Sequence, residues 1–408
     1  MNVLFLVTRY SMLDEHRTLE KELVNAFAND PKNKVYVATI TERRFKEKTH
    51  ITQKDNITIL NIKVGNLYNE VSMLEKKITA ATLSTLYPRA IKKHFKDINI
   101  DWIVTYTPYL SSSKLISPLK KFFNAKATVM HWDIFPQNAE NLGIIKNKLL
   151  LSYFKIQQKK MLKEYEVIAC NSQGNIDYFL NPKFSLDNNK FHLYPNAETI
   201  TRPLKVDRAE TRNKHGFSDN DIILMFGGNI GRPQHLENII FLAEQLKAHK
   251  DIKFLIVGQG CEAENIKALS KKQANITFID FLARDEYEVL LISCDIGILS
   301  LSPKFTVPNF PAKLTGYLKN GLAVLALVDQ AAYNDAGQFI KHHHLGAAFL
   351  GENIKNNLEE IKQFILNKEQ LTAMKINALN IYKEQFDIDI CYPNLLKKME
   401  SVSHLAIS

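Results

Sequence analysis

The sequence lacks closely spaced cysteines. Only four cysteines occur among its 408 residues, and no Cys-x-x-Cys pair is present. A compact structural zinc site needs such spacing, and a small secreted scaffold needs a dense disulfide framework. The sequence therefore predicts reduced, mostly buried thiols in a cytosolic protein.

Long apolar runs are also missing. No stretch reaches the roughly 18 apolar residues that a membrane-spanning helix requires. The first seven residues are mostly apolar, but they lack the basic leader and small-residue cleavage site of a secretory signal. We expect a first buried strand here, in a chain that does not cross a membrane by itself.

Two common phosphate-binding fingerprints are absent. The sequence has no Gly-Lys-Ser/Thr, as in a P-loop, and no Gly-x-Gly-x-x-Gly after its first strand. His342, His343 and His344 are adjacent rather than spaced i, i+4, so they predict a basic helix end rather than a metal site.

Acidic residues are too few to balance the charge of the first half. Residues 1–200 hold 29 Lys and Arg against 19 Asp and Glu, whereas residues 201–408 hold 24 of each. The net charge of +10 therefore comes from the first half. This asymmetry favours an anionic partner for one domain, and nucleic acid and an anionic membrane both fit.

Short apolar runs alternate with amphipathic segments along the whole chain, which is typical of βαβ units and a parallel sheet. The polar stretch after Tyr194-Pro195-Asn196-Ala197 divides the pattern. We predict two doubly wound domains, residues 1–195 and 196–385, and a C-terminal helix over 386–408 that could cross back to the first. Expected strands are 2–8, 35–40, 57–64, 102–105, 127–131, 167–171, 222–226, 254–257, 276–279, 296–299 and 323–327; expected helices are 15–29, 83–97, 146–165 and 235–249.

A glycine-rich turn, Phe226-Gly-Gly-Asn-Ile-Gly-Arg-Pro-Gln234, lies between an expected strand and an expected helix. Glycines let backbone amides approach an anion, and Arg232 could add a full charge. A purely structural turn explains the same residues equally well. Downstream, Lys313 falls in the first turn of a helix, where it opposes the helix dipole. A bound diphosphate would explain that position, and a solvated surface lysine is the alternative.

Five blocks of the second half, in order and over about 100 residues, resemble the donor domain of family 4 retaining glycosyltransferases. The bacterial polysaccharide branch that includes L-fucosamine transferases is the most similar. The blocks are Gly227–Gln234, Phe254–Gly260, Ile276–Phe281, Cys294–Leu299 and Pro311–Ala326. The first half resembles the same branch more weakly, through His131–Gly143, Ala169–Gln173 and Tyr194–Ala197.

This resemblance implies a GT-B fold, in which two Rossmann-like domains face each other across a cleft. It implies a cytoplasmic enzyme at the inner face of the plasma membrane that moves a sugar from a UDP-sugar to a lipid-linked glycan in capsule or O-antigen synthesis. It implies no cofactor and no metal. The donor-binding residues it assigns are Gly228, Asn229, Gly231, Arg232, Gln234, Gln259, Phe281, Lys313 and Leu314.

The sequence departs from that family at the donor site. Many members carry two glutamates eight residues apart, whereas Pro308 and Gly316 stand at these positions here. The family's Arg and Lys of the donor loop fall on Asn229 and Gln234. Arg232 and Lys313 therefore remain as the cations expected to stabilise the leaving phosphates.

Asp133 and His131 are the candidates nearest the reacting sugar, because they end an expected strand and face the cleft in the family pattern. Period-two alternation would place both on the same side of the strand. A turn carboxylate and an interior histidine are the structural alternatives.

Two basic amphipathic segments, 114–126 and 146–163, suit either an anionic bilayer surface or simple packing on the first sheet. Two other functions stay open from the residues alone. A non-hydrolysing nucleotide-sugar epimerase shares the two-domain fold, although the five donor blocks fit it poorly. A basic nucleic-acid-binding protein would explain the charge, although no recognised binding module is present.

Overall fold

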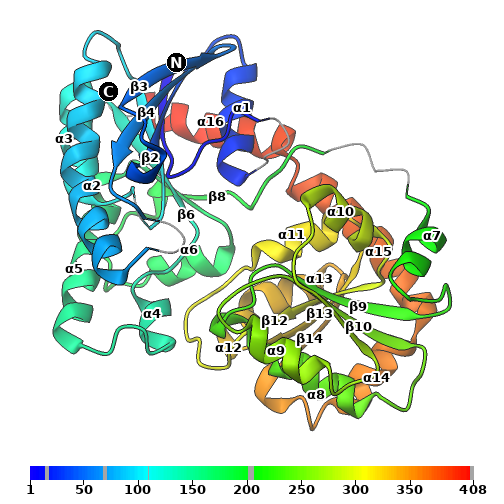
Figure 1. The fold of residues 1–408 in the computed structure, drawn as a ribbon. Helices are drawn as coiled ribbons and strands as arrows, with labels where there is room; N and C mark the ends of the chain where they lie inside the picture. The colour runs from blue at the N-terminus through cyan, green and yellow to red at the C-terminus, as the bar shows by residue number, and fades with distance from the viewer. Residues whose placement is uncertain (14–17, 68–70, 109, 201–205, 405–408) are drawn as a thin grey trace. The chain divides into compact units, whose positions relative to one another are not determined.

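The computed structural model describes residues 1–13, 18–67, 71–108, 110–200 and 206–404, and it forms two units (Figure 1). The first unit contains residues 1–136, 145–199 and the C-terminal segment from Ile388; the second contains residues 137–144 and 200–387. The chain therefore passes between the units after Pro136, Ile144, Thr199 and Asp387. The expected boundaries, after residues 195 and 385, lie close to the last two of these crossings, and the grouping of 137–144 with the second unit was not expected.

The first unit is built on an eight-stranded sheet in the order β3-β4-β2-β1-β5-β6-β7-β8. All neighbouring strands run parallel except β3 and β4, which pair antiparallel at one edge. The strands are β1 Asn2–Leu6, β2 Lys34–Glu42, β3 His50–Lys54, β4 Ile57–Val64, β5 Trp102–Tyr106, β6 Lys126–His131, β7 Val167–Cys170 and β8 Phe191–Leu193.

Helices cover both faces of this sheet, and side-chain caps fix where several of them begin. Thr18, Ser72, Asn147 and Ser172 each accept a hydrogen bond from a backbone amide in the first turn that follows. The helices are α1 Leu19–Asn29, α2 Met73–His94, α3 Ser113–Phe123, α5 Lys148–Glu164, α6 Gln173–Phe179 and α16 Ile388–His404.

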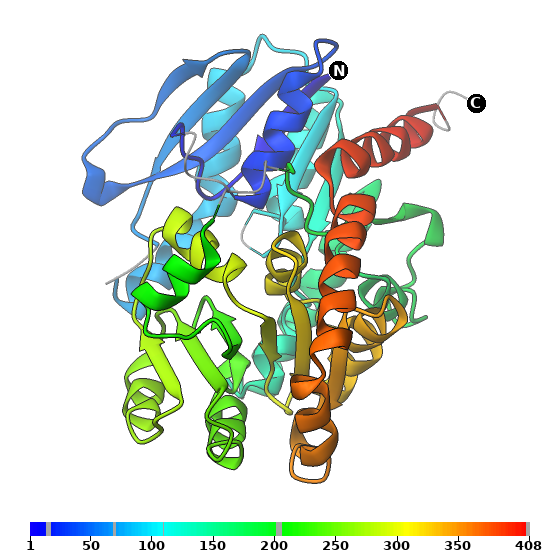
Figure 2. The ribbon, with the colours of Figure 1, turned by 90° about the vertical axis from the view of Figure 1, so that its right-hand side faces the viewer.

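The C-terminal helix α16 packs on α1 in the first unit (Figure 2). Its Ile388, Cys391, Leu395 and Met399 join the hydrophobic core of this unit. The ring of Tyr392 lies edge-on to Phe27 of α1, with centroids 4.8 Å apart. The chain thus returns to its first unit after completing the second.

The second unit has an all-parallel sheet in the order β11-β10-β9-β12-β13-β14. Alternate residues of β9 serve opposite faces: Ile223 and Met225 belong to one core cluster, and Leu224 and Phe226 to the other. The strands are β9 Ile222–Gly227, β10 Ile252–Val257, β11 Ile276–Ile279, β12 Ile296–Ser300, β13 Ala323–Val328 and β14 Gly346–Leu350.

Helices lie on both faces of the second sheet as well. They are α7 Arg208–Lys214, α8 Glu237–Gln245, α9 Ala263–Ser270, α10 Arg284–Ile292, α11 Ala312–Lys319, α12 Gln330–Ala332, α13 Gln338–His342, α14 Leu358–Leu366 and α15 Lys368–Gln385, with α4 Gln137–Asn141 grouped with this unit. The prediction of two doubly wound α/β domains is confirmed. No helix in the described ranges is long and apolar enough to cross a membrane.

The strand order reverses at one place in each sheet, between β1 and β5 and between β9 and β12. In doubly wound sheets, ligands bind outside the carboxyl ends of the strands at this switch point. In the second unit, the glycine-rich turn begins where β9 ends, at Gly227. The topology alone therefore places this turn at the expected ligand position.

Candidate functional site

The glycine-rich turn packs backbone against backbone on the turn that follows β10. A Cβ atom on Gly258 would lie 1.9 Å from the carbonyl oxygen of Gly228, and one on Gly260 would lie 2.2 Å from that of Ile230. Gly258 also has a φ of +153°, which L-residues rarely adopt. Gly258 and Gly260, which follow β10, are therefore needed for the glycine-rich turn after β9 to pack against them.

Most amides of this turn are already engaged within the protein. Gly228 N donates to Val257 O at 2.9 Å, Ile230 N donates to Gln259 O at 2.8 Å, and Gly231 N donates to Gln234 Oε1 at 3.1 Å. We expected the amides of residues 228–231 to bind a phosphate, but these three amides already donate within the protein. An anion at this turn would therefore be stabilised mainly by side chains.

Lys313 supplies that charge. It is the second residue of α11, and its Nζ lies 4.4 Å from the centre of the Phe226 ring, directly before the glycines. Its Cε would be 3.2 Å from a Cβ on Gly228, so the side chain lies against the turn. Burial lowers the pKa of its ammonium to about 8. No hydrogen bond or ion pair to it is present within the described parts of the chain. An unpaired, desolvated cation of this kind is costly unless an anion binds it.

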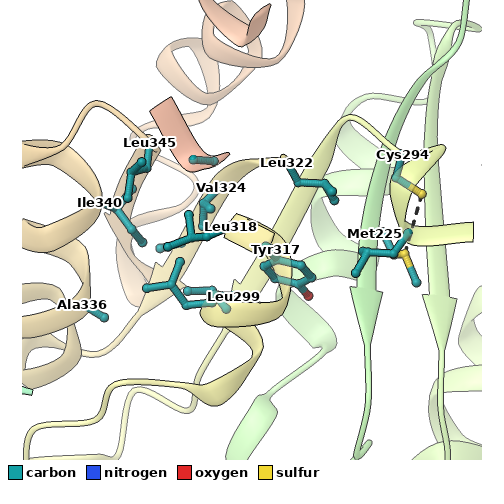
Figure 3. Packing of buried hydrophobic residues seen from close by; sticks show 14 of the residues in the cluster. Met225, Cys294, Leu299, Tyr317, Leu318, Leu322, Val324, Ala336, Ile340 and Leu345 are labelled. Atoms are coloured by element: carbon teal, nitrogen blue, oxygen red, sulfur yellow. Dashed lines mark hydrogen bonds between the residues drawn. The ribbon is translucent and has the colours of Figure 1, made fainter. Parts of the chain in front are cut away.

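Packing beneath α11 fixes the position of Lys313 (Figure 3). Tyr317, one turn later, is buried, and its hydroxyl donates to the carbonyl of Ile298 in β12 at 3.0 Å. Gly297 makes room for this ring, because a Cβ there would lie 2.3 Å from Tyr317 Cγ. The start of α11 is thereby held at the carboxyl end of β12, at the switch point.

The other expected donor-loop side chains are used in part by the loop itself. Gln234 Oε1 accepts from Gly231 N, and Asn229 Nδ2 lies 3.5 Å from the same oxygen. Arg232 is 77% exposed, and its Nε lies 3.3 Å from Glu262 Oε1. Gln234 and Asn229 therefore brace the turn, and the charge of Arg232 is partly balanced by Glu262.

A cavity of about 360 Å³ lies beside the turn. Gly231 and Arg232 line it together with Ser302, Pro303 and Lys304, which follow β12. The amide of Ser302 donates to Pro233 O at 2.8 Å and joins the two segments. Lys304 was not predicted as a site residue, although its position directly after a buried strand of the switch point could have indicated it.

The remaining donor candidates lie in different environments. Gln259 is exposed, and its carbonyl braces the glycine turn. Phe281 is 68% exposed beyond the end of β11. The side chain of Leu314 is completely buried in the core cluster, so it cannot contact a ligand without rearrangement. Gly228, Asn229, Gly231, Arg232 and Gln234 are thus the expected residues that form the turn, and Lys313 is the expected residue that lies against it.

In the first unit, Asp133 and His131 differ sharply in environment. His131 is the last residue of β6, is buried, and packs edge-on against Phe179, which lowers its pKa to about 4. It is therefore neutral near pH 7. Asp133 is exposed, and desolvation raises the pKa of its carboxyl. Because β6 ends at His131, strand alternation does not fix the direction of Asp133, and that step of the sequence argument is wrong.

The sequence also contains two Asp-x-Asp triplets, at 219–221 and 387–389. The Asp221 carboxylate accepts the amide of Ser218 at 2.8 Å, as part of a turn before β9. Within the described residues, no group of three or more His, Cys, Asp or Glu side chains is placed to hold a metal ion. Metal independence stays a prediction.

Comparison with known proteins finds a family match within the second unit. Residues 207–380 match the family described as "Glycosyl transferases group 1". This segment contains the second sheet, the glycine turn and Lys313, and it is similar to the domains of that family.

Two kinds of relative extend the comparison. WcaI of Escherichia coli K12, named for glycosyl transfer in colanic acid biosynthesis, is 25% identical over 265 residues. That match covers 63% of this chain and 63% of WcaI, which is less than two thirds of either. Sucrose-phosphate synthase from Thermosynechococcus elongatus superposes with a TM-score of 0.74 at 13% identity, with both chains fully covered. Anabaena HepE, solved with UDP and glucose, superposes with a TM-score of 0.65 at 14% identity. That match covers 98% of this chain and 100% of the HepE chain. The whole chain therefore has the GT-B fold.

Proposed function

We propose that this protein is a retaining glycosyltransferase that moves a sugar from a nucleoside diphosphate sugar to a lipid-linked glycan in bacterial surface polysaccharide synthesis. The donor we favour is a UDP-sugar carrying a hexose or a deoxyaminohexose such as L-fucosamine. The observation that carries the proposal is the desolvated Lys313 against Gly228, at the switch point of a glycosyltransferase group 1 domain.

The mechanism we propose needs no protein base. Negative charge develops on the leaving diphosphate as the glycosidic bond breaks, and a fixed cation in a desolvated position stabilises that charge strongly. Lys313 supplies this cation, and Arg232 and Lys304 lie nearby on the cavity beside the turn. For transfer with retention, the departing phosphate itself accepts the proton of the attacking hydroxyl.

The direct test is product analysis. The purified protein is incubated with single UDP-sugars and a synthetic lipid diphosphate-linked sugar, and the product is identified by mass spectrometry and by the anomeric coupling in its NMR spectrum. The proposal predicts one added sugar with the anomeric configuration of the donor. An inverted linkage, or epimerised donor without transfer, would contradict it, and the second outcome would support the epimerase alternative.

The affinity for UDP should fall as the pH rises through about 8. The pKa of Lys313 is lowered to about 8 by burial, so its charge is present below this pH and lost above it. Calorimetric titration with UDP between pH 6.5 and 9.5 measures the effect. Lys313→Arg is the matched variant, because guanidinium stays charged throughout this range. It should bind UDP with little dependence on pH, and a similar pH slope in both proteins would exclude Lys313 as the source.

Asp133 is proposed as the group near the reacting sugar. Asp133→Asn removes its charge with little change in shape, and kcat should fall by about 10²-fold, as for other groups that stabilise a transition state. The donor affinity should change much less. Asp97→Asn is the control, because Asp97 is an exposed carboxylate of the same unit. Normal turnover in Asp133→Asn would assign Asp133 a structural role.

The membrane surface we propose is the outer face of α5. Leu149, Leu150, Tyr153 and Ile156 are exposed at helical spacing along it, with Leu149 84% exposed. Six lysines occur between residues 146 and 163, so apolar side chains and positive charge share one helix. This combination suits an anionic bilayer that carries a lipid-linked acceptor.

Leu149→Glu should weaken binding to vesicles of phosphatidylglycerol and phosphatidylcholine by about tenfold, because burying one leucine contributes about 1.5–3 kcal/mol. Ile51→Glu is the matched control on β3 of the same unit, where Ile51 is 46% exposed. Co-sedimentation measures both variants. Equal vesicle binding by Leu149→Glu and the parent protein would remove α5 from the membrane surface, and tighter binding to oligonucleotides than to vesicles would support the nucleic-acid alternative.

A further inference from the structure

A second cationic cavity lies at the amino ends of the strands of the second sheet, whereas the glycine turn lies at their carboxyl ends. It measures about 430 Å³ and opens at the amino ends of β9 and β12, beside Ile222 and Asp295. One wall is α7, through Arg208 and Arg212, and another is α15, through Lys368, Thr372 and Lys375. None of these residues belongs to the site proposed for the donor.

Three cations converge on one carboxylate in this cavity. Lys375 Nζ lies 2.7 Å from Asp295 Oδ1, Arg212 Nη2 lies 2.7 Å from Oδ2, and Arg208 Nη2 also contacts Oδ1. The amide of Ile223 adds a fourth donor at 2.9 Å from Oδ2. The carboxylate is fully used, and its single negative charge is shared among three cations.

Arg212 differs from the other two cations, because every nitrogen of its guanidinium group donates a hydrogen bond within the protein. Arg212 is buried and donates to the carbonyls of Ser293, Ser218, Asp219 and Asp221 as well as to Asp295, so its role is structural. Among the residues that the structure describes, Arg208 and Lys375 donate hydrogen bonds to Asp295 alone, and both side chains line the cavity with donors to spare.

Lys368 and Thr372 extend the same face of α15 towards its N-terminus, at i−7 and i−3 from Lys375. Residues at this spacing lie above one another on one side of a helix. Two carboxylates, Asp219 and Asp221, line the turn on the other side of the cavity, and that of Asp221 is held by the amide of Ser218. The positive excess therefore belongs to the walls formed by α7 and α15.

We propose that this cavity binds the phosphate group of a small soluble molecule between Arg208 of α7 and Lys368, Thr372 and Lys375 of α15. A phosphate provides several strong acceptor oxygens and more than one negative charge, which matches the unused donors of Arg208 and Lys375 and the excess of cations over carboxylates on these two walls. The cavity is large enough for a phosphate with a small organic substituent.

Binding here would affect two of the places where the chain passes between the units. Helix α7 is the first element after the crossing that follows Thr199, and α15 is the last element before the crossing that follows Asp387. A phosphate that joins α7 to α15 therefore ties together the element that follows one crossing and the element that precedes another. This site would regulate the protein by stiffening those elements, independently of what the glycine turn binds.

The test is calorimetric titration of the full chain with inorganic phosphate at constant ionic strength. The Lys313→Ala background is used so that binding near the glycine turn does not contribute. The proposal predicts one site with a dissociation constant below about 10 mM, since millimolar affinity requires only about 4 kcal/mol. No measurable phosphate binding in this background would overturn the proposal.

Two double variants then locate the site. Arg208→Gln with Lys368→Gln should raise the dissociation constant for phosphate at least tenfold, while Arg212 and Lys375 still hold Asp295 and keep the unit folded. Lys250→Gln with Lys272→Gln removes the same charge near the amino ends of β10 and β11 and should leave phosphate affinity unchanged. Thermal unfolding checks that both variants remain folded. Equal losses in the two variants would show a general charge effect and overturn the proposed site, as would unchanged affinity in the first.

Discussion

Lys313→Ala should reduce the affinity for UDP by about 10²-fold, because a hydrogen bond to a charged group contributes about 1.5–3 kcal/mol and the remaining contacts of the turn do not replace it. Most amides of the glycine turn are already paired within the protein, so they cannot replace the charge that Lys313 brings to Gly228. Calorimetric titration with UDP measures the loss.

The same substitution should stabilise the ligand-free protein. The pKa of Lys313 is lowered in the folded state, so the fold disfavours its charge, and this cost is fully present below pH 8 and fades as the pH rises towards 10.5. Lys313→Ala should therefore have the higher Tm at pH 7 without ligand. Lys250→Ala, a change of an exposed lysine in the same unit, is the control for both measurements. UDP affinity equal to that of the parent protein would remove Lys313 from the donor site.

Gly258→Ala should destabilise the second unit by about 3 kcal/mol and abolish UDP binding without touching the ligand. The added Cβ would lie 1.9 Å from Gly228 O, a backbone atom that cannot move alone, and the φ of +153° adds strain for any L-residue. Urea unfolding and UDP titration measure the two effects.

Gly316→Ala is the matched control. Gly316 lies within α11, three residues after Lys313, and no atom lies within 4 Å of a Cβ placed there. Replacing a helical glycine by alanine should stabilise the protein by about 0.5–1 kcal/mol and leave UDP binding intact. If Gly258→Ala kept the stability and the UDP affinity of the parent protein, the close packing of the two turns would not matter for the site.

Much of the fold could be predicted because parallel strands buried on both faces are continuous apolar runs. The strands β9, β10, β12 and β13 follow that rule closely, and β11 is an apolar but partly exposed edge strand. Each of their expected ranges falls on a strand of the structure. The strands that were not predicted are not long apolar runs buried on both faces. Strand β3 is a half-exposed antiparallel edge, β8 has only three residues, and β14 begins Gly346-Ala347-Ala348, whose small side chains give a weak apolar signal.

The start of α2 was missed for a related reason. It begins at Met73, ten residues before the expected helix, and its first turns expose Leu74 and Ile78. A helix that does not bury its apolar residues lacks the periodic pattern from which a helix is predicted. Its cap at Ser72, with Glu75 three residues later, was the available signal.

The candidate site could be predicted in outline but not in its contacts. The family resemblance assigned the glycine turn and Lys313 to one donor site, and the structure places Lys313 against Gly228. The sequence could not show that Gln234 takes the amide of Gly231, or that Glu262 partly neutralises Arg232, since both depend on side-chain conformation. The buried face of α11 likewise placed Leu314 in the core, which motif matching does not reveal.

The central claim is that the turn around Gly228 and Lys313 binds a nucleoside diphosphate without a metal. The most direct measurement is thermal unfolding of the full chain with UDP, GDP, ADP, CMP or dTDP, each with and without magnesium, since a ligand that binds only the native state raises its apparent stability. The account predicts that UDP raises the Tm selectively, to the same extent with and without magnesium, and that Lys313→Ala abolishes the rise. No rise with any nucleotide at millimolar concentration, or a rise that persists in Lys313→Ala, would contradict it.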